Sequence, residues 1–269
     1  VDRGATEVCL QGGIHPKYSG ETYLEIVKAI RSASPSIHIH AFSPLEIDHG
    51  RKTLNISTKE FLQELQKAGL NSLPGTAAEI LHDDIREIIC PDKLTSNQWI
   101  EIIETAHSVG LPTTSTMMFG HIERTAHVAH HLLELLNLQK RTNGITEFVP
   151  LPFVADEAPI FRRGKARPGP TFKETILVHS VARILFQGQI NNIQGSWVKM
   201  GLPGLKFLLS SGINDIGGVL MNESITRSAG ASFGQELQLK DVVGIANELN
   251  LNIQQRNTLY DSLNNNLHD

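Results

Sequence analysis

Short apolar runs alternate with longer amphipathic stretches along the whole chain. The apolar runs have the length of buried strands, which are nearly continuous hydrophobic segments in a parallel sheet. The stretch 21–33 instead places Tyr23, Ile26, Val27 and Ile30 on one face at helical spacing. The pattern predicts seven strand–helix units, with strands at 6–11, 36–42, 69–75, 112–119, 144–151, 190–195 and 214–220.

Capping residues mark the ends of several predicted helices. Ser57 and Glu60 have the Ser-x-x-Glu spacing of a capping box, and Gly69 ends that helix. Thr95 or Ser96 is the N-cap expected for the following long helix. These signals support helices between the predicted strands.

Strict alternation of strands and helices predicts an α/β fold with a parallel sheet and right-handed crossovers. A closed (βα) TIM-type barrel has eight such units, and seven are counted here. We therefore expect one barrel domain over 1–269 that contains strands two to eight, with the first βα unit upstream of Val1. The end of the chain, 252–269, is expected to be a frayed tail.

Composition and charge indicate which partners the chain can bind and in which cellular compartment it is expected. Hydrophobic residues make up 40% of the 269 residues and the net charge is −4, so no basic excess indicates nucleic acid. No apolar run approaches the ~18 residues that a membrane span needs. Cys9 and Cys90 form neither a disulfide framework nor a CxxC motif, which fits a reducing cytoplasm. Cys9 is expected to be a small core residue of its strand.

The ends of the predicted strands are polar and rich in glycine. In barrels of this type the active site lies at these ends. Gln11, Gly12 and Gly13 end the first strand, and paired glycines let a ligand approach the backbone closely, although a tight turn without a ligand also needs them. The other strand-end segments are His40 with Ser43, 75–79, 116–123, 150–152, 194–199 and 215–223.

Two histidines offer an alternative chemistry. His38 and His40 are two positions apart, so they share one face of a strand and could chelate a metal. With Asp215 as a base or ligand, this pattern is compatible with a metal-dependent barrel hydrolase. The other interpretations of these histidines are hydrogen bonds to an organic ligand or packing inside the barrel.

The string "QGSWVKMG" at 194–201 gathers ligand-binding side chains at one strand end. Trp197 can stack on a flat ring and donate its N–H, or it can close the barrel mouth. Gln194 is suited to the edge of a pyrimidine. Asp215 and Glu223 flank another glycine pair near the last strand.

The strings "VCLQGGIHP", "IHIHAFSPLE", "PGTAAEIL", "TSTMMFGHIE", "FVPLPF", "NIQGSWVKMG" and "GGVLMNESITRSAGA" together resemble one family. It is the radical S-adenosylmethionine (SAM) enzymes that build deazaflavin and futalosine-pathway intermediates. Within it, the chain is most similar to the tyrosine 4-hydroxyphenyl transferase subunits of deazaflavin (FO) synthase, over Gly4 to Ala231.

The resemblance implies a barrel whose first strand is followed by a CxxxCxxC loop that holds a 4Fe–4S cluster, with SAM on its fourth iron. Cys9 and Cys90 cannot supply that loop. We therefore expect the chain to be a fragment whose cluster cysteines lie upstream of Val1, with no metal ligand in the chain itself.

The resemblance also assigns roles to individual residues. Gln11, Gly12 and Gly13 stand where the family holds the methionine amino group, although Ile14 and His15 replace the usual acidic residue. The residues it implies for SAM are Gln11, Gly12, Gly13, His40, Glu79, Thr116, Gly120 and Glu123. Those we assign to the substrates are His15, Gln194, Trp197, Asp215 and Glu223.

The implied reaction joins the 4-hydroxybenzyl group of L-tyrosine to 5-amino-6-(D-ribitylamino)uracil. It needs an electron donor, and the other FO synthase subunit is an expected partner. We expect this piece alone to be inactive. The alternatives are a sister radical SAM enzyme such as aminofutalosine synthase or the other FO synthase subunit, the metal-dependent hydrolase, and a barrel that only binds ligand or docks on a partner.

Overall fold

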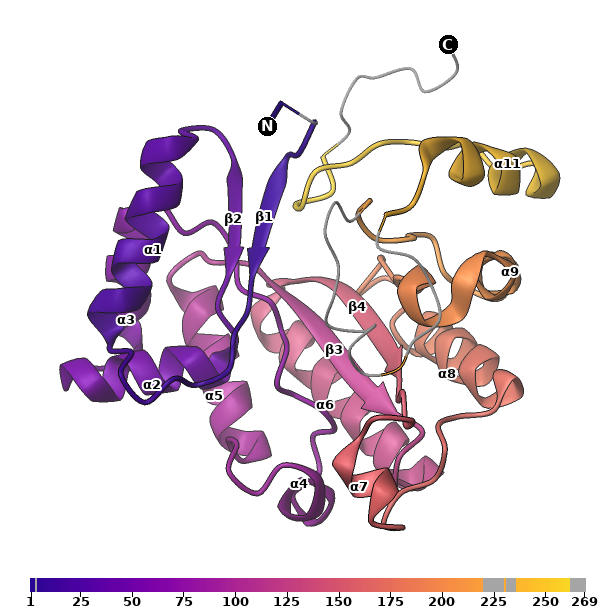
Figure 1. The fold of residues 1–269 in the computed structure, drawn as a ribbon, viewed down its shortest axis with the longest axis horizontal. Coiled ribbons are helices and arrows are strands. Elements are labelled where there is room, and N and C mark those ends of the chain that lie inside the picture. The colour runs from indigo at the N-terminus through magenta and orange to yellow at the C-terminus, as the bar shows by residue number, and fades with distance from the viewer. Residues whose placement is uncertain (3, 220–229, 231–235, 262–269) are drawn as a thin grey trace.

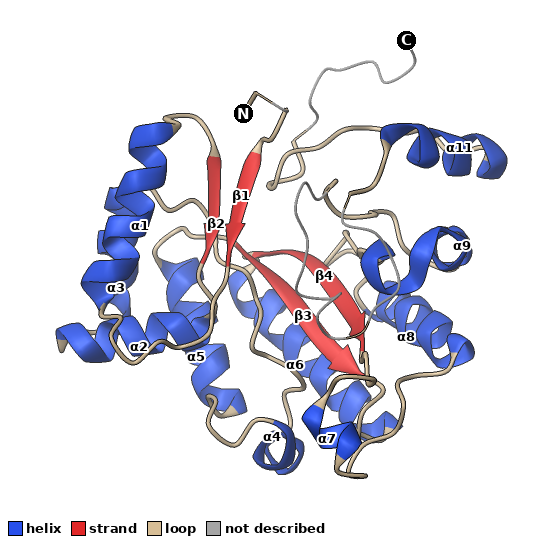
Figure 2. Ribbon diagram, viewed as in Figure 1, coloured by secondary structure: helices blue, strands red, loops and turns tan. Residues whose placement is uncertain are grey.

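The computed structural model describes residues 1–2, 4–219, 230 and 236–261. Figure 1 shows the path of the chain, and Figure 2 shows strands at the centre with helices arranged around them. The strands are β1 (Glu7–Leu10), β2 (His38–Ala41), β3 (Thr113–Phe119) and β4 (Ile145–Pro152). The helices are α1 (Gly20–Ala33), α2 (Pro44–Leu54), α3 (Thr58–Ala68), α4 (Asp83–Ile89), α5 (Ser96–Ser108), α6 (Thr125–Thr142), α7 (Pro159–Arg162), α8 (Phe172–Leu185), α9 (Trp197–Leu209) and α11 (Leu239–Leu249).

All strand pairs are parallel and follow chain order. β1 pairs with β2, and β3 pairs with β4. Single parallel bridges continue the series at His40–Ser72, Leu73–Thr113, Phe148–Ile193 and Gln194–Asp215. All seven predicted strand positions are thus confirmed as consecutive parallel segments.

Three of the predicted strands are reduced to one or two bridged residues, around 72–73, 193–194 and 215. Pro74 follows the first of these segments and Gly195 the second, and neither residue type extends a ladder well. Among the described residues no bridge joins β1 to the segment at Asp215. The described sheet is therefore an open parallel series.

The helices cover one face of the sheet with apolar contacts. Ile39 and Ala41 of β2 pack into a cluster built largely from α1, α2, α3 and α5. Met117 and Phe119 of β3, with Phe148 of β4, pack into a second cluster that includes α5, α6 and α8. These residues alternate along their strands, so their neighbours point to the other face.

The opposite face of the sheet is polar. Its side chains include His40, Thr114, Thr116 and Glu147, which are at most 8% exposed. Cys9 also lies on this face and is exposed, so its predicted place in the apolar core is wrong. The period-two alternation of β1 explains the difference, because Val8 and Leu10 take the apolar side.

The predicted helix starts are confirmed. The side chains of Ser57 and Thr95 cap α3 and α5, each within a capping box. Ser43 caps α2 in the same way, with Glu46 as the reciprocal partner. No helix in the described part of the chain has the length and apolar character that crossing a bilayer requires.

The predicted tail 252–269 lies outside the description after residue 261. Its described part contacts the sheet at two strands that are far apart in the sequence. Thr258 donates a hydrogen bond to Glu7 of β1, and Arg256 forms an ion pair with Asp215. Residues 256–258 therefore link the first and last described strand positions.

Candidate functional site

Parallel strands bring their carboxyl ends to one edge of the sheet. The loops after β1, β2, the bridged residues 72–73 and β3 therefore share one edge. Four of the predicted SAM-binding segments lie in or next to these loops. The side chains around each loop decide what it can bind.

The loop after β1 is held by a carboxylate from α2. The Gly12 N–H donates to Glu46 Oε1 at 3.0 Å, while Glu46 Oε2 accepts from the N–H (2.8 Å) and hydroxyl (2.7 Å) of Ser43. Burial raises the pKa of Glu46, and the hydrogen bonds from Ser43 and Gly12 oppose that shift. Gly13 stays open, because a Cβ placed there would meet nothing within 4 Å.

Two buried hydroxyl groups near this edge have no hydrogen-bond partner among the described residues. They are Tyr23 Oη in the first turn of α1 and Thr76 Oγ1 beside Gly75. Buried polar groups in native proteins are nearly always paired with protein, water or ligand. Both hydroxyls therefore remain able to bond water or a polar ligand.

Thr116 fixes the segment that leads to Glu79. Its hydroxyl donates to the Gly75 carbonyl at 2.8 Å, and the Gly75 N–H donates to Thr114 Oγ1 at 3.0 Å. A Cβ at Gly75 would lie 2.0 Å from the Thr114 carbonyl oxygen, so only glycine fits. Glu79 accepts from the Met118 N–H at 2.7 Å through its carbonyl, and its carboxylate pairs with Lys93 at 2.5 Å.

The loop after β3 is organised around Glu123. Its carboxylate accepts from the N–H groups of Gly120 (2.6 Å) and His121 (2.8 Å) and pairs with Arg167 at 3.1 Å. Although burial acts to raise the pKa of Glu123, the backbone hydrogen bonds and nearby charges hold it below its usual range. Gly120 has φ +96°, and a Cβ there would lie 2.2 Å from Pro170 Cδ. Glu123 therefore shapes this loop.

The two histidines of β2 form hydrogen bonds with another residue of the chain. His38 Nε2 and His40 Nδ1 both contact Ser72 Oγ, at 2.6 and 2.7 Å. Burial is the main reason that the pKa of His40 falls to about 3. Among the described residues no group of three or more histidine, cysteine, aspartate or glutamate side chains is placed to hold a metal. The structure gives the hydrolase alternative no support.

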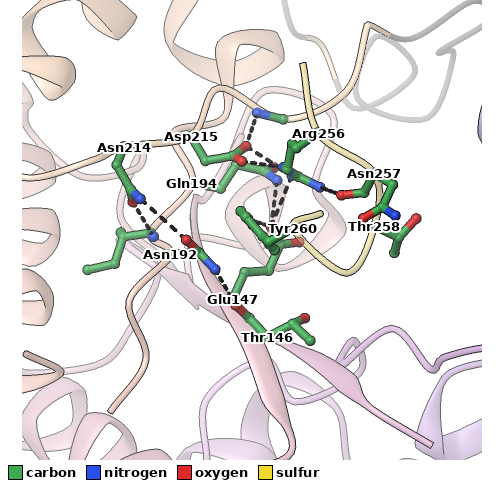
Figure 3. Close-up of polar contacts among 12 residues, drawn as sticks. Thr146, Glu147, Asn192, Gln194, Asn214, Asp215, Arg256, Asn257, Thr258 and Tyr260 are labelled. Carbon is green, nitrogen blue, oxygen red and sulfur yellow. Dashed lines mark hydrogen bonds and ion pairs between the residues drawn. The ribbon is translucent and has the colours of Figure 1, made fainter. Parts of the chain in front are cut away.

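Gln194 and Asp215 come together on neighbouring strand segments, as Figure 3 shows. Gln194 Nε2 donates to Glu147 Oε2 at 3.3 Å. Trp197 is 5% exposed within the apolar cluster, and its N–H donates to the Gly218 carbonyl at 3.3 Å. This contact holds the chain beyond Asp215 rather than leaving the indole N–H open.

The remaining predicted residues lie apart or outside the description. His15 is exposed, accepts from the Lys17 N–H at 3.2 Å and stacks on Tyr18. Gln11 is exposed, and its side-chain amide donates to Cys9 Sγ at 3.3 Å. Glu223 lies outside the described residues. These positions stay predictions.

Sequence reasoning missed several polar residues of the site. Glu46 had a signal, because Ser43-x-x-Glu46 is a capping box directly after a strand. Glu147 also had one, since it is a carboxylate inside an apolar strand run. Arg256 and Tyr260 had none, because their segment follows the predicted repeat and its place depends on tertiary contacts.

The chain's own thiols do not fit an iron–sulfur cluster. A cluster of the expected kind needs three cysteines, and the sequence contains only Cys9 on β1 and Cys90 at the end of α4. Although Cys9 is accessible from one side, the protein around it desolvates the thiol and raises its pKa to about 11, and desolvation also raises the pKa of Cys90. Neither thiol is poised as a thiolate ligand.

Two family models cover almost the whole chain. Residues 1–136 match the Radical SAM superfamily. Residues 142–268 match the CofH/MqnC C-terminal region.

Proteins with similar sequences include two transferases of the same name and an FO synthase. The 5-amino-6-(D-ribitylamino)uracil--L-tyrosine 4-hydroxyphenyl transferase of Methanothermobacter thermautotrophicus is 45% identical over 97% of this chain and 71% of its own length. The protein of the same name from Methanopyrus kandleri is 48% identical over 97% of this chain and 70% of its own length. The FO synthase of Streptomyces coelicolor is 47% identical over 96% of this chain, which spans only 30% of that longer protein.

Solved structures agree on the fold. Methylornithine synthase (PylB) superposes with a TM-score of 0.66 at 14% identity, over 93% of this chain and 69% of that protein. The Elp3 protein of Methanocaldococcus infernus gives a TM-score of 0.51 at 14% identity, over 71% of this chain and 48% of that one. At this identity the likeness concerns the α/β fold alone.

Proposed function

Given that this chain belongs to the radical SAM family of 5-amino-6-(D-ribitylamino)uracil--L-tyrosine 4-hydroxyphenyl transferases, we propose that it forms the barrel in which that transfer takes place. The substrates are L-tyrosine and 5-amino-6-(D-ribitylamino)uracil, and the product is an intermediate of the deazaflavin cofactor FO. The observation that supports this best is identity of 45–48% to two such transferases over 97% of the chain.

The proposal extends to the fold. The seven parallel segments are strands two to eight of a radical SAM barrel, within one domain. The superfamily uses a 4Fe–4S cluster and SAM, and the two cysteines of this sequence cannot bind that cluster. Its thiolates are therefore supplied from outside these 269 residues.

SAM, when bound, supplies the radical that abstracts hydrogen from tyrosine. The open backbone at Gly13 and the loop held by Glu46 leave room for its amino-acid end. Gln11, His40, Glu79 and the loop Gly120–Glu123 would hold the rest of the molecule, with Thr116 keeping the Glu79 segment in place.

The two substrates occupy the polar inner face of the sheet. Gln194, Asp215, His15 and Glu223 are assigned to this part of the site, and the buried Trp197 contributes by holding the Gly218 carbonyl. The side chains there orient the substrates and exclude water, which protects a radical reaction from unwanted hydrogen donors. An electron donor completes the system, and the other FO synthase subunit is a proposed partner.

A chimeric enzyme tests this function. In it, the present chain replaces the aligned 260 residues of the Methanothermobacter transferase, which keeps its own remaining segments. After anaerobic cluster assembly, we expect a product with the mass of the 4-hydroxybenzyl adduct from tyrosine and the aminouracil. The 269-residue chain alone, treated identically, should give none. Absence of the adduct from a folded, cluster-loaded chimera would contradict the proposal.

A further inference from the structure

A polar group lies deeper on the inner face than the strand-end loops. It consists of Glu147 on β4, Gln194 and Asp215 on the bridged segments, and Arg256 and Tyr260 from the described part of the C-terminal segment (Figure 3). β1 contributes Glu7, which accepts from Thr258. The contacts among these residues join positions up to 251 apart in the sequence, so the fold alone assembles them.

The charge of Arg256 is matched by Asp215. Its Nε and Nη2 atoms reach both oxygens of that carboxylate, with Nη2 to Oδ1 at 3.0 Å. Its Nη1 donates to the Asn257 carbonyl at 3.1 Å, and the guanidinium stacks 4.1 Å from the Tyr260 ring centroid. A bidentate pair of this kind is strong and directional. Glu147 receives only a longer contact, 3.3 Å from Nη2.

Glu147 is asymmetric in its contacts. Gln194, Arg256 and Tyr260 all donate to Oε2, whereas Oε1 receives no hydrogen bond from the described residues. The residue is only 8% exposed. The carbonyl oxygen of Gln194 likewise accepts no hydrogen bond within the described parts of the chain. The Glu147 carboxyl and the Gln194 amide therefore each keep one oxygen without a donor among the described residues, and the Gln194 oxygen lies beside Gly217.

The protonation state of Glu147 defines what it can bind. Burial raises the pKa of Glu147 to about 7, with Arg256 opposing and Asp215 adding to the shift. Because Oε2 already accepts three hydrogen bonds, the protonated form offers a ligand one donor at Oε1. With the Gln194 carbonyl oxygen as the acceptor, the two side chains match a C=O next to an N–H on a planar ring. The titratable and charged groups that face Glu147 are Arg256, Tyr260, Asp215, Glu7 and Cys9.

The group is connected to the strand-end loops. Cys9 accepts a hydrogen bond from Gln11 at 3.3 Å, and the pKa of its thiol responds to the charge of Glu147. Cys9 and Glu147 both point to the inner face of the sheet, and the hydrogen bond from Gln11 links Cys9 to the loop after β1.

We propose that Glu147 and Gln194 form a subsite for the amide edge of a pyrimidine ring, and that Arg256 and Tyr260 are positioning residues that hold the Glu147 carboxyl. The inference rests on the proposed function, because the aminouracil is the heterocycle among its substrates. It adds a carboxyl and two residues of the C-terminal segment to the site.

The test uses 6-(D-ribitylamino)uracil, which keeps the amide edge and lacks the reactive 5-amino group. Its affinity for the 269-residue chain is measured by calorimetry from about pH 6 to about pH 9. We expect the affinity to fall as pH rises through the pKa of Glu147, by about tenfold for each pH unit above it. Glu147→Gln keeps a donor and an acceptor, so it should bind within about threefold at low pH and lose that decline.

Two further variants separate recognition from a structural role. Glu147→Ala should bind about tenfold more weakly at low pH. Tyr260→Phe removes a hydrogen bond that lowers the pKa of Glu147, so the midpoint of the pH profile should move upward. Circular dichroism confirms that each variant is folded.

Three results would overturn the inference: a wild-type profile parallel to that of Glu147→Gln, a Glu147→Gln affinity as low as that of Glu147→Ala, or no binding of the probe. The adduct assay with the chimera decides the proposed function independently. If the chimera forms the adduct but wild type and Glu147→Gln show the same pH dependence of affinity, the proposed subsite is wrong and the proposed function stands.

Discussion

Single side chains determine whether the strand-end loops are shaped to receive a ligand. Glu46 joins a helix start to the Gly12 N–H, and Glu123 closes the loop after β3 on itself. Each carboxylate accepts backbone N–H groups that would otherwise require water. The loops therefore have a fixed conformation before a ligand binds, which lowers the entropy lost on binding.

Replacement of Glu46 by glutamine should raise the KM of the chimera for SAM by about tenfold, because a charge-assisted hydrogen bond to Gly12 is lost. Glu60→Gln is the matched control, since Glu60 caps α3 through Ser57 with nearly the same distances, and no contact with a strand-end loop is described for it. Steady-state kinetics measure both. Equal KM changes in the two variants would show that Glu46 acts only as a helix cap.

Residue patterns in the sequence predicted some residues of the candidate site and missed others. Gly12 and Glu123 follow strands and Thr116 lies within β3, so the barrel rule identified all three as candidates. The structure adds that the side chains of Thr116 and Glu123 form hydrogen bonds with backbone groups. Trp197 was open to two interpretations, and burial favours the one without an exposed ring. Arg256 stayed hidden because its partner Asp215 is 41 positions away.

Secondary structure elements explain why the repeat was predictable. Alternate residues of β1 to β4 bury apolar side chains against the helices, and side-chain caps mark the starts of α2, α3 and α5. Both features leave a clear pattern in the sequence. The weakest strands, at 72–73 and 193–194, were still located because the helices around them fix their positions. The C-terminal segment has no such repeat, and its described residues are held by tertiary hydrogen bonds and ion pairs.

The C-terminal segment should stabilise the fold through Arg256. Removal of its guanidinium in Arg256→Ala leaves Asp215 and Glu147 buried without a cation, at a cost of about 3–5 kcal/mol in the free energy of unfolding. Lys206→Ala, which removes the exposed pair with Glu248, should cost less than about 1 kcal/mol.

Urea unfolding of the three proteins measures these differences. The larger loss of Arg256→Ala should appear as a clear fall in the unfolding midpoint at unchanged slope. Equal midpoints for the two variants would mean that the segment does not stabilise the sheet.

The whole molecule should lose stability in mild acid because several histidines are buried in neutral form. Burial lowers the pKa of His40 and His131 to about 3 and of His107 and His179 to about 4, from 6.5. Between these values the unfolded chain binds more protons than the folded one. Stability therefore falls as pH drops from about 6.5 toward about 4, by up to about 1.4 kcal/mol per pH unit for each histidine.

Carboxyls with raised pKa values act in the opposite direction. Glu7, Glu46 and Glu147 stay protonated to higher pH in the folded protein, so they favour the folded state in acid. At most three carboxyls favour the folded state in acid, whereas the four histidines with the largest pKa shifts favour the unfolded state. Melting temperatures measured from about pH 7 to about pH 4 should decline, and a constant or rising value would contradict this balance.

At the scale of the whole molecule, we propose that this chain provides the barrel in which tyrosine donates its 4-hydroxybenzyl group to the aminouracil. The most direct measurement gives the cluster-loaded chimera ring-deuterated tyrosine and determines the mass of the aminouracil product. We predict a product heavier by the ring label, formed only when tyrosine, the aminouracil and SAM are all present. An unlabelled product, or SAM cleavage without any adduct, would contradict the claim.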